Sequence, residues 1–386
     1  MKCEITVGNN GCNSFTQCDD TNHPAGYMIL NSMVGLNNMV MNQYEAISRA
    51  GIQMASTVGS LRKTFGTFPQ DNYVFKLIMD YVGLGFVVGG APLWNKMFKK
   101  IPYFKTHGDE LSTLKDTVNG LVMNGFTIIK DRRKVTIPAD MDDALTQGVA
   151  TVTAEWYEGF RTLHEQLFNG SDSSVATLSN LFKDGKMLQN GYDLMSDLEI
   201  QEVMSRALYV TLIPMAWSLS KDIGVVVIDA RRPCGTVDPL SKNELSKEDS
   251  NASWVCHDNN MYFLIAADGE EQHCWQSNGP DAPVPNWDCL SNPFKLPPGL
   301  KALDGSAWGK LTKEDFVKGA VNSFKANGSK NGGKAANTVV GTDTVDNIQD
   351  MDVQAPGIVY IPVCTITEAR KNWAGTSKRS ANYPCN

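Results

Sequence analysis

Three charged residues in the second half of the chain are of types that suit hydrolysis. Asp229 lies at the end of the β-branched run Gly224–Ala230 and is followed by Arg231, while Asp258 lies in a polar turn between two apolar runs. Paired carboxylates at a cleft are the usual requirement for glycoside hydrolysis. A simple ion pair of Asp229 with a neighbouring arginine is the commoner arrangement. Asp229, Arg231 and Asp258 are therefore candidates to inspect, with Asp229 first.

Patterns for other chemistries are missing. The chain has no GxSxG nucleophile elbow and no HExxH zinc motif. His257 and His273 adjoin Cys256 and Cys274, which suggests zinc. Neighbours on a strand point to opposite faces, however, so such pairs rarely bind one metal. We expect no metal and no cofactor.

The cysteines and sequons indicate a secreted, disulfide-stabilised glycoprotein, against the alternative of a cytosolic protein with scattered thiols. None of the cysteines lies between residues 19 and 233. Nine is an odd number, so one stays unpaired and would allow a homo-oligomer. The cysteines are Cys3, Cys12, Cys18, Cys234, Cys256, Cys274, Cys289, Cys364 and Cys385. The glycosylation sequons begin at Asn169, Asn251 and Asn327.

Composition narrows the class of partner. The chain has 386 residues, 42% of them apolar, and a formal net charge of −7. This suits a folded globular protein, and it lacks the basic field that nucleic-acid binding needs. We therefore expect the partner to be an unidentified protein or a membrane, and not a nucleic acid. The opening MKCEITVGNN lacks the apolar core of a signal peptide, so we expect an extracellular mature form.

The apolar segment Phe75–Phe98 is the candidate for membrane contact. A buried hairpin in a helical bundle is the favoured interpretation, and a concealed membrane element is the alternative. Length permits a span, but a carboxylate within hydrocarbon costs several kcal/mol. The residues that bear on this are Leu77, Asp80, Gly85, Gly89 and Trp94.

The predicted fold is α+β, with three parts. Residues 1–24 form a cysteine-containing arm, residues 25–222 a helical domain with the apolar hairpin, and residues 223–386 a smaller cysteine-rich α+β domain. Apolar residues at helical spacing predict a long helix over Tyr27–Phe65.

Capping boxes and β-branched runs predict the remaining elements that matter here. Ser196 with Glu199, and Thr312 with Asp315, predict helix starts. Strands are expected at Gly224–Ala230, Ser253–Cys256, Met261–Ala267 and Gly357–Val363, and a long loop over residues 276–300.

Several strings together resemble a family of secreted fungal proteins of unknown function. They are ALYVTLIPMAWSLS, VCHDNNMYFLIAADG and LDGSAWGKLTKEDFVKGAVNSFKANGSKNGG, the last containing Trp308-Gly309. The resemblance covers most of the chain. It implies secretion and a fungal source, and it supplies no catalytic residues.

These observations favour a secreted, non-enzymatic protein, toxin- or effector-like, with residues 75–98 as its candidate membrane-interacting segment. The alternative is an extracellular hydrolase that uses acidic residues of the C-terminal domain.

Overall fold

The structure is a computed structural model, and it describes part of the chain. The described residues are 12, 17, 22–66, 93, 96–111, 141–187, 195–220, 223–240, 244–267, 274–277, 286–289, 294–332, 352–375 and 382–385. Within residues 274–277 and 286–289 only the backbone is described. Five membrane candidates and two cysteines of the sequence analysis lie outside these residues: Leu77, Asp80, Gly85, Gly89, Trp94, Cys3 and Cys18.

The chain divides into two compact units that interleave in sequence. The first unit holds residues 1–58, 82–208 and 338–350, and the second holds residues 59–81, 209–337 and 351–386. The predicted domain limits at 24 and 222 stay a prediction.

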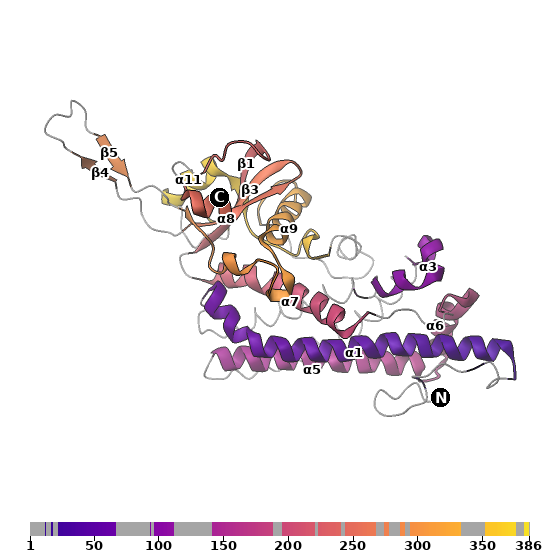
Figure 1. Cartoon of the computed structure of the whole chain (residues 1–386). Helices are drawn as coiled ribbons and strands as arrows, with labels where there is room; N and C mark the ends of the chain where they lie inside the picture. Colours follow the sequence, from indigo (N-terminus) through magenta and orange to yellow (C-terminus); the bar gives the residue numbers. More distant parts are fainter. Residues whose placement is uncertain are drawn as a thin grey trace. The chain divides into compact units, whose positions relative to one another are not determined.

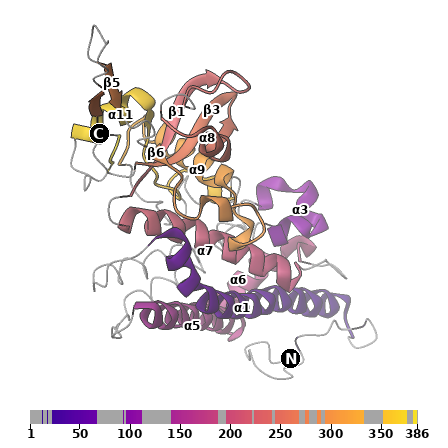
Figure 2. The same ribbon diagram turned by 60° about the vertical axis from the view of Figure 1, so that its left-hand side comes forward.

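Two long helices are the largest described elements of the first unit. Helix α1 (Pro24–Phe65) is continuous, which confirms the predicted long helix. Its part in this unit buries Leu36, Val40 and Ile47 along one face, as the spacing of apolar residues requires. Helix α5 (Met141–Phe168) runs beside it (Figures 1 and 2).

Polar and aromatic contacts join α1 and α5. The rings of Tyr44 and Tyr157 are 3.6 Å apart between centroids. The buried His164 Nε2 lies 2.7 Å from Asn37 Oδ1, and Asn37 Nδ2 donates to the Cys12 carbonyl. These hydrogen bonds offset the cost of burying Asn37 and His164 Nε2.

Shorter helices of the first unit include α3 (Pro102–Thr106), α6 (Asp172–Phe182), η2 (Lys183–Gly185) and the start of α7 (Asp197–Leu219). The predicted Ser196–Glu199 capping box is present, since Ser196 N donates to Glu199 Oε2 and Glu199 N donates to Ser196 Oγ. Pro214 lies inside α7, which continues through it. Among the described helices of the chain, none combines the length and apolar character that crossing a bilayer requires.

A mixed five-stranded sheet is the centre of the second unit. Its order is β2-β3-β1-β7, with β6 also paired to β3; β1 is antiparallel to β3 and parallel to β7. The strands are β1 (Gly224–Pro233), β2 (Trp254–His257), β3 (Asn260–Ala267), β6 (Phe294–Lys295) and β7 (Val363–Thr365). A separate antiparallel pair consists of β4 (Cys274–Ser277) and β5 (Asn286–Cys289).

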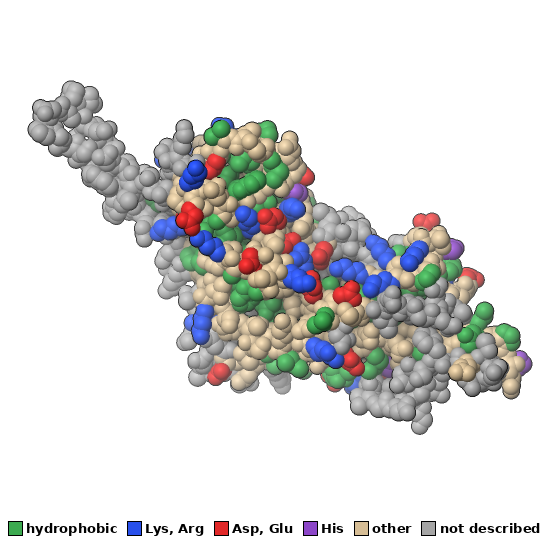
Figure 3. Space-filling model, in the orientation of Figure 1, with side chains coloured by type: hydrophobic (Ala, Val, Ile, Leu, Met, Phe, Trp, Pro, Cys, Tyr) green, Lys and Arg blue, Asp and Glu red, His purple; other side chains and the backbone are tan. Residues whose placement is uncertain are grey.

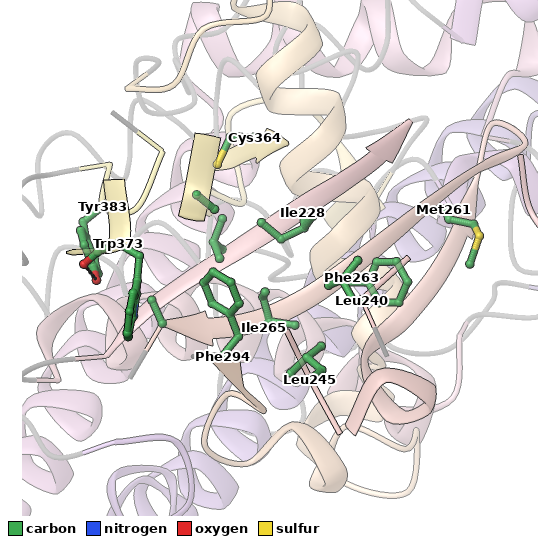
Figure 4. Close-up of a cluster of buried hydrophobic side chains, with 13 residues drawn as sticks. Ile228, Leu240, Leu245, Met261, Phe263, Ile265, Phe294, Cys364, Trp373 and Tyr383 are labelled. Carbon is green, nitrogen blue, oxygen red and sulfur yellow. Dashed lines mark hydrogen bonds between the residues drawn. The ribbon is translucent and has the colours of Figure 1, made fainter. Parts of the chain in front are cut away.

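Helices cover the sheet, which explains its apolar strands. Strand β3 is buried from Met261 to Ala267, as expected for a strand with both faces covered. Helix α9 (Lys313–Ala326) packs on β1, β2, β3 and β7, α8 (Lys247–Ser253) on β3, and α11 (Ile366–Gly375) on β1 and β7. Figure 4 shows the cluster in which Phe263, Ile265 and Phe294 meet, with Trp373 and Tyr383 close to one another.

A chain of aromatic rings lies in the same unit. Phe65 contacts Trp308 at 5.0 Å and Trp217 at 6.1 Å between centroids, both edge-on. Trp308 contacts Tyr209, and Trp217 contacts Phe316. The indole Nε1 of Trp217 donates to the Pro298 carbonyl, so its buried N–H is satisfied.

Two expected elements differ from the structure. Of the strand predicted at Gly357–Val363, only Val363 lies in a strand, β7; Gly357 has a φ of +88° and Pro362 lacks a backbone N–H for a ladder. The loop predicted over residues 276–300 contains β5 and β6, and its ends overlap β4 and η3 (Leu300–Ala302). The predicted α+β class is confirmed, as are the hairpin of β2 with β3 and the Thr312–Asp315 capping box.

Candidate functional site

Asp229 lies where β1 leaves the regular ladder. It pairs with Tyr262 of β3 on one side and with Thr365 of β7 on the other, and the register shifts immediately after it. Its Oδ1 accepts from Arg231 N at 2.8 Å and from Asn260 Nδ2 at 2.6 Å. The short Asp229–Arg231 turn explains the φ of +50° at Arg231. The carboxylate is therefore fixed in position at a strand end.

A cavity of about 610 Å³ opens beside this strand end. It holds two carboxylates and two cations, together with polar groups and an aromatic ring. The lining residues are Asp229, Arg231, Phe324, Ser329, Lys330, Asn331, Val363, Cys364, Thr365, Glu368, Asn382 and Cys385. Pockets of this size hold small organic ligands, and their few polar groups set orientation.

Glu368 is the second carboxylate of the cavity. Its Oε2 accepts from the N and Oγ1 of Thr365 at 2.9 and 2.8 Å, and Glu368 N is 3.3 Å from Thr365 Oγ1, so the two form a capping box at the start of α11. These hydrogen bonds, and the charge of Arg231, lower the pKa of Glu368. We did not predict Glu368 from the sequence, although Thr365 and Glu368 show capping-box spacing directly after a strand.

Asp258 lies apart from the cavity. It is on the exposed turn between β2 and β3, where Lys325 Nζ donates to its Oδ2 at 2.7 Å. That hydrogen bond, with the charge of His257, lowers the pKa of Asp258. The structure thus brings Asp229 and Arg231 to one cavity and pairs Asp258 with a lysine.

A smaller cavity of about 230 Å³ adjoins the first and shares Phe324, Lys330, Asn331 and Asn382 with it. Its other lining residues are Ala320, Ser323, Gly332, Val359, Tyr360, Ile361 and Pro362. We call the larger one the polar cavity and the smaller one the apolar cavity. Asn331 fixes their shared wall, since its amide side chain both donates to and accepts from the Val363 backbone.

Two disulfides crosslink the second unit. Cys234 pairs with Cys256 and Cys364 with Cys385, and Cys12 is also in a disulfide. The Cys364–Cys385 bridge lines the polar cavity. Beside it the buried Tyr383 donates its hydroxyl proton to the Trp373 carbonyl.

Cys274 and Cys289 are direct partners across β4 and β5. The three sequon asparagines, Asn169, Asn251 and Asn327, are exposed, and their glycosylation stays a prediction.

The described residues hold no metal-ligand cluster, and the face drawn in Figure 3 shows no basic field. Within the residues that the structure describes, no three histidine, cysteine or acidic residues cluster as metal ligands. Figure 3 shows basic and acidic side chains interspersed on the face in view.

The chain is similar to two chitinases of Penicillium expansum. "Probable chitinase LysM18" is 24% identical over 422 residues, covering 100% of this chain and 28% of the relative. "Secreted chitinase LysM12" is 25% identical over 376 residues, covering 88% of this chain and 24% of the relative. The chain spans about a quarter of the length of these curated relatives. No model of a known protein family matches the chain, and no solved structure matches it.

These comparisons correct one prediction and confirm another. The non-enzymatic, toxin- or effector-like interpretation is wrong, because the relatives that align along the chain are chitinases. The alternative of an extracellular hydrolase fits them better. The predicted extracellular location is confirmed, since one relative is a secreted chitinase. The resemblance to secreted fungal proteins is consistent with these relatives, whereas the unknown function that it implied is not confirmed.

Proposed function

We propose that this chain acts in extracellular chitin degradation and that its polar cavity binds the chitin saccharide. The observation that carries the proposal is the convergence of Asp229, Arg231 and Glu368 on one cavity, in a chain aligned along its length with chitinases. Sugar hydroxyl and amide groups need several fixed donors and acceptors. The ends of β1 and β7 supply these from rigid elements.

Hydrolysis within the cavity is the more specific form of the proposal. It needs one carboxyl that donates a proton and one ionised carboxylate that acts as base or nucleophile. The lowered pKa of Glu368 suits the ionised role. Asp229 is the other carboxyl that lines the same cavity. Binding alone needs only the hydrogen-bonding groups.

The test uses the 386-residue chain, produced by a secretory host so that its disulfides form. Binding to chitin oligosaccharides is measured by calorimetry, and release of reducing ends is measured from colloidal chitin. We expect Asp229→Asn and Glu368→Gln each to weaken binding or turnover at least roughly tenfold, because each removes a charge from the cavity. Saccharide binding without reducing ends would restrict the role to binding.

The substitutions are chosen to preserve the fold. Asparagine keeps the Oδ1 that Arg231 N and Asn260 contact, and glutamine at a helix N3 position still forms a capping box. Glu248→Gln is the control, because Glu248 is an exposed glutamate of α8 that pairs with Lys301. Absence of both binding and turnover in the wild-type chain would overturn the proposal.

A further inference from the structure

The sequon at Asn327 lies at the rim of the polar cavity. Asn327 directly follows α9, it is exposed, and its sequon continues through Gly328 to Ser329. Ser329 lines the polar cavity, and so does the next residue, Lys330. The sequon and this part of the cavity wall therefore belong to one turn.

A hydrogen bond joins the glycan attachment atom to that wall. Asn327 Nδ2, the atom that receives the sugar, donates to the Lys330 carbonyl at 2.8 Å. An asparagine amide carries two protons, and glycosylation replaces one of them, so the other can continue to donate to Lys330. The first sugar of a glycan would thus begin within one hydrogen bond of a residue that lines the polar cavity.

The other two sequon asparagines are placed differently. Asn169 follows α5 in the first unit, and Asn251 lies within α8 of the second unit. Neither is among the residues that line the two described cavities. Of the three sequons, the one at Asn327 is therefore the one whose glycan would begin beside the polar cavity.

The chemistry of a glycan at this position matches the ligand proposed for the cavity. Eukaryotic N-linked glycans begin with two N-acetylglucosamine units that are joined by the same linkage as in chitin. A ligand tethered beside its site by a short flexible link has an effective concentration on the order of millimolar. Such a ligand competes with free saccharide even when its intrinsic affinity is low.

We propose that the first two sugars of an N-linked glycan at Asn327 compete with saccharide for the polar cavity and so restrain binding by the glycosylated chain. This rests on the proposed function. The restraint acts through the carbohydrate, because the remaining amide proton lets the turn keep its hydrogen bond between Asn327 and Lys330. Trimming the glycan after the protein has folded should therefore open the cavity.

The experiment measures the affinity for a chitin tetrasaccharide by calorimetry, with the 386-residue chain made in a glycosylating secretory host. It compares the intact glycoprotein, the same protein trimmed by an endoglycosidase that cuts between the first two sugars, and Asn327→Gln. We expect the trimmed protein and Asn327→Gln to bind at least roughly tenfold tighter than the intact glycoprotein, because both lack the tethered disaccharide. Asn251→Gln is the matched control: it removes the exposed sequon asparagine of α8 and should bind as weakly as the intact glycoprotein.

The outcomes separate this inference from the proposed function. Peptide mapping should find the glycan on Asn327, and an unmodified Asn327 would overturn the inference. Equal affinities of the intact and trimmed proteins would also overturn it and leave the proposed function standing. The trimmed protein decides if it disagrees with Asn327→Gln, because trimming leaves the side chain that bonds to Lys330 unchanged. If none of the forms binds the tetrasaccharide, the proposed function itself fails.

Discussion

Two glutamates of the second unit have pKa values displaced in opposite directions. Hydrogen bonds from Thr365 lower the pKa of Glu368. Burial raises the pKa of Glu244, and the nearby Arg370, whose Nη1 is 2.8 Å from Glu244 Oε1, only partly offsets this. The two residues therefore contribute to stability in opposite pH ranges.

Glu368 should stabilise the fold above acidic pH. Its folded pKa lies below the unfolded value, so its contribution is present above the unfolded pKa and is lost as pH falls through the folded pKa. Glu368→Gln should cost about 0.3–1 kcal/mol at pH 7, the usual value of a charge in the first helix turn. Urea midpoints from pH 3 to 7 measure this. The same cost at both ends of that range would contradict it.

Glu244 should show the reverse dependence. Its folded pKa lies above the unfolded value, so stability falls as pH rises from the unfolded pKa through the folded one. Glu244→Gln should flatten this slope and leave the protein equally or more stable at neutral pH. Arg370 tolerates the loss because half of its side chain is exposed to water. Thermal melts across pH test this. If the ion pair with Arg370 instead dominates, Glu244→Gln would show a marked loss of stability at pH 7.

At the scale of single residues, the sequence identified Asp229 and Arg231 but not Glu368. Asp229 and Arg231 follow a recognisable buried strand, so their position at a strand end was predictable. Glu368 was not identified, because β7 reaches β1 through a parallel pairing between residues distant in sequence. No local pattern reveals that Thr365 lies beside Asp229.

At the scale of secondary-structure elements, the turn before η3 packs closely against the C-terminal end of α1. Gly299 has a φ of +74°, and a Cβ there would lie 2.5 Å from Phe65 Cδ1. The ring of Phe65 is held between Trp217 and Trp308, so it has little freedom to withdraw. The aromatic chain thus depends on a glycine at this position.

Gly299→Ala should destabilise the protein by roughly 2–4 kcal/mol, combining left-handed strain with an overpacked ring. Gly305→Ala is the control, since Gly305 has a φ of +81° but its nearest neighbour would be 3.5 Å from the new Cβ. It should cost only the strain, about 1 kcal/mol. Chemical denaturation measures both, and equal costs would refute the crowding argument.

Elements with a local signal were predicted, and those that depend on distant partners were not. The Thr312–Asp315 box and the β2–β3 hairpin are set by neighbouring residues. Strands β5 and β6 were assigned to a loop because their short segments lie among prolines and asparagines, and pairing with β4 and β3 makes them strands.

At the scale of the whole molecule, two disulfides close loops of similar length, but they differ in whether they line the polar cavity. Their sequence separations are 22 for Cys234–Cys256 and 21 for Cys364–Cys385, so removal of either should cost about 3 kcal/mol. Only Cys364–Cys385 lines the polar cavity. The double variant Cys364→Ala with Cys385→Ala should therefore also weaken saccharide binding. Cys234→Ala with Cys256→Ala should not, and equal binding losses would contradict this.

Cys274 and Cys289 should form a further bridge. Cross-strand partners have Cβ atoms about 4.5–5.5 Å apart, near the separation that a disulfide spans, and these two are paired in register. Peptide mapping without reduction should recover them linked. Recovery of either one alkylated as a free thiol would contradict the register.

The mixed sheet also sets an order in time. As the chain is synthesised, β1 and β3 can pair soon after they emerge, and Cys234 and Cys256 can then meet. Strand β7, which completes the other side of β1, comes much later. Until then the edge of β1 has unpaired backbone groups, and contacts between distant residues form slowly. The residues that complete the polar cavity thus emerge well after β1 and β3, and nascent chains that stall before β7 are the ones most exposed to aggregation.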